Sequence, residues 1–66
     1  MHVYSMFLDS GAGAFGAVRT VWLWNDNVAV EIGRRMLNNY SGVDVWRDGS
    51  RVALLRREQA NFQLAS

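Results

Sequence analysis

The sequence predicts an α+β fold of the order strand, strand, helix, strand, strand, with one helix packed on one face of a four-stranded, mainly antiparallel sheet. Three observations support this prediction. Apolar side chains alternate with a period of two in residues 2–8, 15–24 and 43–57, and repeat about every 3.6 residues between 26 and 39. An Asn-Asp pair precedes the helical pattern. An Asp-Gly pair divides the last strand pattern into a hairpin.

The first two strands are separated by a glycine-rich segment. Residues 2–8 (HVYSMFL) alternate between two faces, as a short strand does. Residues 15–24 (FGAVRTVWLW) are rich in the β-branched and aromatic side chains that favour strands. Residues 9–13 (DSGAG) between them are expected to form a loop, because glycine tolerates backbone conformations that other residues avoid.

The helix is expected over residues 26–39. Asn25 or Asp26 can accept a hydrogen bond from the free amides of its first turn. Gly33 in a helix interior costs about 1 kcal/mol relative to alanine, so we expect the helix to approach the sheet closely at this residue. The stripe that faces the sheet repeats at helical spacing and comprises Ala29, Ile32, Gly33, Met36 and Tyr40.

The last hairpin is expected to turn at Asp48-Gly49, a pair that favours a tight two-residue turn. Such a turn pairs Val45 with Val52 and Val43 with Leu54 on one face of the sheet. The opposite face of the hairpin then carries Asp44, Trp46, Arg51, Ala53, Leu55 and Arg57.

These alternations divide the sheet into a face that the helix covers and an uncovered face. The covered face is expected to hold Tyr4, Met6, Leu8, Val21, Leu23, Val43, Val45, Val52 and Leu54. The uncovered face is expected to expose Phe7, Val18, Trp22, Trp24, Trp46 and Leu55. A large exposed apolar patch on a small protein usually marks an interaction surface. The candidate interaction surface comprises Trp22, Trp24, Trp46, Arg51, Leu55 and Arg57.

Trp46 is expected opposite Arg51, close enough for the guanidinium to stack on the indole, and beside Trp22. Such a surface suits a protein interface in which arginine stems cover apolar area. It also suits a platform for single-stranded nucleic acid, on which bases stack and arginines hold phosphates. The net charge of +1 favours the protein interface, because affinity for nucleic acid depends mainly on neutralising phosphates.

The composition predicts one small domain, over residues 1–58, followed by a polar tail at 59–66. A domain of this size buries only about 60% of the surface of its unfolded chain, so additional stabilisation is expected. The sequence of 66 residues has no cysteine for a disulfide, and its one histidine, His2, lies near the N-terminus, which argues against a zinc site. Self-association is the remaining source of stability.

No catalytic residue, metal ligand or cofactor is expected. The serines lack an internal histidine base, and turns and caps account for the aspartates. The stretch Gly11–Gly16 (GAGAFG) matches a dinucleotide-binding glycine pattern, but the residues that follow favour a strand where that motif requires a helix. A hairpin connection is therefore favoured over a phosphate loop. With no secretory signal and no membrane-spanning run, a cytoplasmic location without membrane partners is expected.

The helix NDNVAVEIGRRML and the hairpin VDVWRDGSRVALL, after a strand-loop-strand start, resemble short uncharacterised ββαββ proteins encoded in GC-rich bacterial genomes. The helix cap, the paired arginines late in the helix and the V-x-V-W hairpin carry this likeness over residues 2–57, while the glycine-rich loop departs from it. The resemblance implies a fold and offers no activity. From the uncovered apolar face and the missing catalytic residues, we expect a non-catalytic homodimer that binds another protein, as an adaptor or as an antitoxin-like or phage-encoded inhibitor. The alternative is a nucleic-acid-binding module.

Overall fold

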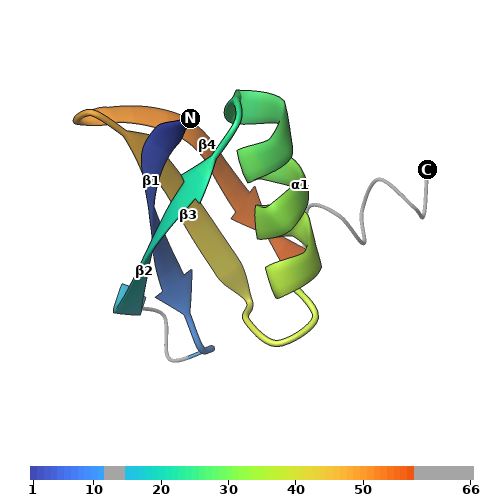
Figure 1. The fold of residues 1–66 in the computed structure, drawn as a ribbon. Helices are drawn as coiled ribbons and strands as arrows, with labels where there is room; N and C mark the ends of the chain where they lie inside the picture. Colours follow the sequence, from blue (N-terminus) through green and yellow to red (C-terminus); the bar gives the residue numbers. More distant parts are fainter. Residues whose placement is uncertain (12–14, 58–66) are drawn as a thin grey trace.

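The computed structural model describes residues 1–11 and 15–57, without the side chain of Phe15, and it confirms the α+β fold (Figure 1). The elements are β1 (His2–Asp9), β2 (Phe15–Leu23), α1 (Asp26–Met36), β3 (Gly42–Arg47) and β4 (Ser50–Arg56). The strands form one antiparallel sheet in the order β2-β1-β3-β4, so β2 and β4 are its edges. The expected tail at 59–66 lies outside the described residues.

Helix α1 begins as predicted and ends earlier. The Asn25 side chain accepts a hydrogen bond from the Val28 amide at 2.9 Å, which caps the first turn. The helix ends at Met36, and its last carbonyls accept bonds from the amides of residues 37–40. Leu37, just past the helix, is buried in the core although the helical stripe did not include it. Leu37 keeps helical backbone angles and follows Gly33 by four residues, so helical spacing places it on the same face as Ala29 and Gly33.

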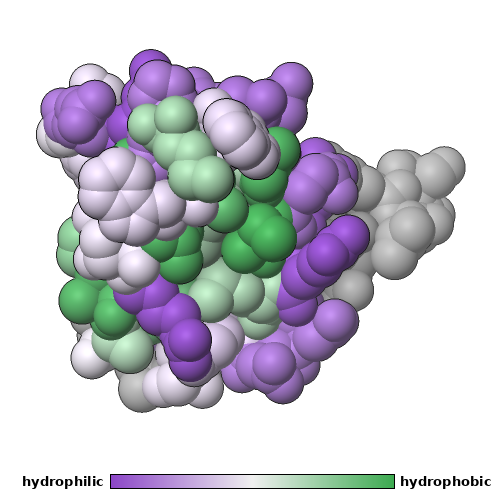
Figure 2. Space-filling view, in the orientation of Figure 1, coloured by the Kyte–Doolittle hydropathy of each residue, from purple (hydrophilic) through white to green (hydrophobic). Residues whose placement is uncertain are grey.

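The core lies between α1 and the sheet. Its buried apolar residues are Tyr4, Met6, Leu8, Ala29, Leu37, Val43 and Val45. Half-buried residues complete it: Val21, Leu23, Ile32, Met36, Tyr40, Val52 and Leu55. The helix packs mainly over β3 and β4, and it contacts β2 less. Figure 2 accordingly shows apolar surface in the region between β2 and α1.

The predicted register of the last hairpin is correct from the turn as far as Trp46 and Arg51, and wrong beyond this pair. Trp46 lies opposite Arg51 as expected, but Val45 pairs with Ala53, which leaves Val52 as an extra residue in β4. Such a β-bulge reverses the faces of all residues that follow it. Leu55 therefore faces the core and Leu54 the uncovered side, the opposite of the prediction. Ala53, expected on the uncovered face, pairs with the buried Val45 instead.

Tyr4 links the core to the start of the helix. Its buried hydroxyl donates a hydrogen bond to Asp26 Oδ1 at 2.7 Å, and Arg47 Nη1 lies 3.1 Å from the same oxygen. Burial, and then the hydrogen bond to Asp26, raise the pKa of Tyr4 above its ordinary value of 10.0. In the unfolded chain the phenol ionises near its ordinary value, so unfolding releases a proton at alkaline pH.

The stability of the protein is therefore expected to fall as the pH rises above about 10, because the unfolded chain binds fewer protons there. Tyr4→Phe is expected to be less stable than the wild type at neutral pH and to lose less on going to alkaline pH. Urea unfolding midpoints between neutral pH and pH 11 measure both effects. Tyr40→Phe is the matched control, and a Tyr4→Phe variant with the same alkaline loss as this control would contradict the assignment.

Candidate interaction surface

The uncovered face of the sheet is formed by alternate residues of the four strands. Cross-strand neighbours form rows across it. One row runs from Trp46 through Ser5 to Thr20, and the next runs from Asp44 through Phe7 to Val18. Trp22 lies on the same face, opposite Val3. The side chains of Phe7, Val18 and Trp22 are exposed, and the indole of Trp46 is half-buried.

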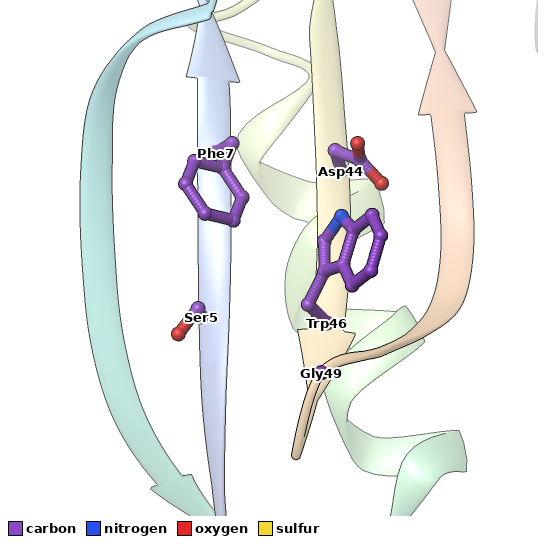
Figure 3. Close-up of a pocket in the computed structure, with 5 residues that line it drawn as sticks. All are labelled: Ser5, Phe7, Asp44, Trp46 and Gly49. Atoms are coloured by element: carbon purple, nitrogen blue, oxygen red, sulfur yellow. The ribbon is translucent and has the colours of Figure 1, made fainter.

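A shallow hollow of about 480 Å³ lies over β1 and β3 on this face. It is lined by Ser5, Phe7, Asp44, Trp46 and Gly49. Figure 3 shows the rings of Phe7 and Trp46 over these two adjacent strands, with Gly49 in the turn that follows β3. The lining is mostly apolar, so the hollow suits an aliphatic or aromatic side chain rather than a charged ligand.

Trp46, Arg51 and Asp44 form a compact cluster beside this hollow. The Arg51 guanidinium carbon lies 5.2 Å from the centroid of the Trp46 ring, which confirms the predicted cation–π stack. The same guanidinium makes a two-pronged contact with Asp44, through Nε–Oδ1 at 2.9 Å and Nη2–Oδ2 at 3.0 Å. The sequence predicts Asp44 on this face but does not predict its contact with Arg51. Asp44 is only 7% exposed, so this pairing compensates a buried carboxylate.

A second carboxylate, Asp9, lies at the end of β1 and is also buried. Its Oδ1 accepts a hydrogen bond from the Gly11 amide at 2.9 Å, and its Oδ2 lies 4.0 Å from Nη1 of Arg56. Arg51 and Arg56, both on β4, thus each have a carboxylate partner on the sheet. The two arginines of β4 on the uncovered face are therefore compensated by carboxylates, whereas the large exposed side chains on its other half, Phe7 of β1 and Val18 and Trp22 of β2, are apolar.

The structure brings together only part of the predicted surface. Trp22 is 66% exposed on the uncovered face, but β1 separates its strand from that of Trp46, so the two indoles are not neighbours as expected. Trp24 is 68% exposed and lies beyond the end of β2, in the connection to α1. Arg57 follows β4, and its Nε donates a hydrogen bond to the Leu37 carbonyl at 2.8 Å. Arg57 therefore lies at the helix end and not on the predicted surface.

The glycine-rich stretch does not lead into a helix. Gly11 has a φ of +108°, a conformation that favours glycine, and β2 begins at Phe15. A dinucleotide-binding motif requires a helix N-terminus at this place. Residues 12–14 of the stretch lie outside the described residues.

Within residues 1–11 and 15–57, no group of three or more His, Cys, Asp or Glu side chains is placed to hold a metal ion. In the same part of the chain, no helix has the length and apolar character needed to cross a membrane. Comparison of the chain with protein-family models, with curated proteins and with solved structures finds no match.

Proposed function

We propose that this chain is a small, cytoplasmic, non-catalytic protein-interaction module that acts as a homodimer. In that form it serves as an adaptor or as an inhibitor of another protein, of the antitoxin or phage-encoded kind. The observation that carries the proposal is the apolar half of the uncovered sheet face, where Phe7, Val18 and Trp22 are exposed. A second copy that covers these side chains supplies the burial that a chain of 66 residues lacks alone.

The charge arrangement favours a protein partner over nucleic acid. A phosphate that binds Arg51 must displace or approach Asp44, which already contacts both prongs of the guanidinium. Arg47 likewise lies 3.1 Å from Asp26, and Arg34 lies 3.9 Å from Glu31. Binding to nucleic acid depends on cations that can neutralise phosphates, and these three arginines already face carboxylates.

The alternative, a platform for single-stranded nucleic acid, is supported by one observation. The stacked pair of Trp46 and Arg51 lies beside a mostly apolar hollow, and bases stack on such rings. This alternative predicts that oligonucleotide binding is lost in Trp46→Ala and weakens steeply with salt, because phosphate contacts release counterions.

Sedimentation of the full chain over a wide concentration range, together with titration of a labelled single-stranded oligonucleotide at low and high salt, tests the proposal. We expect a dimer whose dissociation constant changes little with salt, because its interface is apolar. We also expect no salt-dependent oligonucleotide binding. A chain that stays monomeric at high concentration, and that binds the oligonucleotide through Trp46, would establish the alternative instead.

A further inference from the structure

We propose that two copies of this chain associate edge to edge through β2, in an antiparallel register with Thr20 of each copy on the twofold axis. The two four-stranded sheets then form one continuous sheet with both helices on the same side. This inference rests on the proposed function, which requires a homodimer but does not define its surface. Two observations select β2, and the residues along it select the register.

The first observation is the difference between the two edges of the sheet. Strand β4 carries Arg51 and Arg56 and is interrupted by the bulge at Val52. Charges and bulges are devices that keep an edge strand from pairing with another chain. Strand β2 has Arg19 as its one charged residue, and its bulge lies at its start, where Gly16 is the extra residue between Phe15 and Ala17. Within the described residues, the rest of β2, residues 17–23, pairs with β1 without a bulge and carries only this one charge, so its outer edge is less protected than that of β4. Figure 1 shows β2 at one edge of the sheet.

The second observation is the charge of the uncovered face. Face-to-face packing of two whole sheets would bury the pair of Arg51 with Asp44 and the pair of Arg56 with Asp9. Removing such charges from water is costly, and the cost often exceeds their mutual attraction. Edge pairing through β2 leaves Arg51 and Arg56, on the opposite edge strand β4, in contact with water and their pairs with Asp44 and Asp9 intact. On this face it brings the second copy against the exposed apolar side chains of β2, Val18 and Trp22.

The register follows from the residues of β2. Self-pairing over the whole regular segment 17–23 places its midpoint, Thr20, opposite Thr20 of the second copy. On the uncovered face Val18 then lies opposite Trp22, an aromatic and β-branched pair that stabilises antiparallel strands. On the helix side Arg19 lies opposite Val21. A register shifted to centre on Arg19 would place two arginines directly opposite each other, which is unfavourable.

This arrangement covers apolar surface that the single chain leaves in water. Trp22 is 66% exposed and Val18 56% exposed, and each gains a neighbour from the second copy. On the helix side Val21 and Leu23 are only half-buried, because α1 packs mainly over β3 and β4. A second β2 at this edge lies next to both side chains. Pairing at this edge therefore buries apolar side chains on both faces of the sheet.

Cysteine cross-linking tests the register directly, since the natural sequence has no cysteine. Directly opposite residues in an antiparallel pair have Cβ atoms about 4.5–5.5 Å apart, near the separation that a disulfide spans. Thr20→Cys is therefore expected to form a disulfide-linked dimer in oxidised glutathione. Ser50→Cys, an exposed position on the other edge, is the matched control and is expected to remain uncross-linked. A mixture of Val18→Cys and Trp22→Cys is expected to cross-link, while each alone is not.

Thr20→Lys provides a second measurement without a covalent bond. It places two ammonium groups opposite each other at the axis, and we expect the dissociation constant of the dimer to rise by about fivefold to tenfold. Ser50→Lys is expected to leave it unchanged. Suppose that the wild type is a dimer, but Thr20→Cys cross-links no better than Ser50→Cys or Thr20→Lys dimerises normally. This result overturns the β2 interface and leaves the proposed homodimer intact. A monomeric wild type overturns both the β2 interface and the homodimer.

Discussion

Replacing Gly33 with leucine is expected to lower the free energy of unfolding by about 1–3 kcal/mol, because the added side chain overpacks the contact between α1 and the sheet. A Cβ atom at this position would lie 2.8 Å from Cδ1 of Leu55, 3.4 Å from Cγ2 of Val45 and 3.5 Å from Cγ1 of Val43. The two valines are fully buried, so they have little room to move away from further methyl groups. Urea unfolding followed by circular dichroism measures the loss.

Gly33→Ala is the control that separates overpacking from backbone effects. The closest neighbour of the added methyl group is the tip of the half-buried Leu55 side chain, which can change its rotamer. Alanine also favours the helix by about 1 kcal/mol relative to glycine. We therefore expect Gly33→Ala to remain within about 1 kcal/mol of the wild type. A leucine variant that unfolds at or above the wild-type urea concentration would show that the helix does not pack closely here.

The order of the elements could be predicted from the sequence because each element has a strong local signal. The change of apolar period from two to about 3.6 and back marks the strands and the helix. Asn25 marks the start of the helix, and its side chain does cap the first turn. Gly33 marks the close approach of helix to sheet, since an unfavourable residue in a helix interior needs a packing reason.

The faces of β4 could not be predicted in full because they depend on a bulge. The Asp-Gly turn correctly places Trp46 opposite Arg51. Val52 is then the extra residue, and it brings Leu55 into the core beside Gly33. A run of small and aliphatic residues such as Val52–Leu55 satisfies either face, so the alternation alone does not show where the register shifts.

The sequence predicted only those contacts of the candidate surface that join the two strands of one hairpin. The stack of Trp46 and Arg51 belongs to this class. The expected contact of Trp46 with Trp22 failed because β1 lies between β2 and β3, and sequence order does not fix spatial order in a sheet. The Asp44 carboxylate was missed because it is a diagonal neighbour of Arg51 rather than its direct partner. Diagonal pairs on one face are within reach of long side chains, so this signal was present in the hairpin pattern.

Arg51→Ala is expected to destabilise the fold by about 1–3 kcal/mol, because it leaves Asp44 buried without its main partner. A stacked, exposed cation alone contributes only about 0.5–1 kcal/mol. The two-pronged contact with Asp44 raises this expectation. The Arg51 side chain is 51% exposed, so water moderates the loss and the larger penalty of a fully buried ion pair does not apply.

A double-mutant cycle isolates the contribution of the contact from that of the stack. Arg51→Ala, Asp44→Ala and the double variant are compared by urea unfolding, and we expect a coupling energy of about 0.5–3 kcal/mol. Arg34→Ala is the matched control, because the Arg34 side chain is 65% exposed and lies 3.9 Å from Glu31 on the helix surface. Such an exposed pair contributes at most about 0.5 kcal/mol. Two outcomes would contradict this assignment: Arg51→Ala lowers the free energy of unfolding no more than Arg34→Ala does, or the effects of the two single variants add up to that of the double variant. Either outcome would show that Asp44 does not depend on Arg51. The uncovered face would then lack the charge compensation on which the protein-interaction proposal relies.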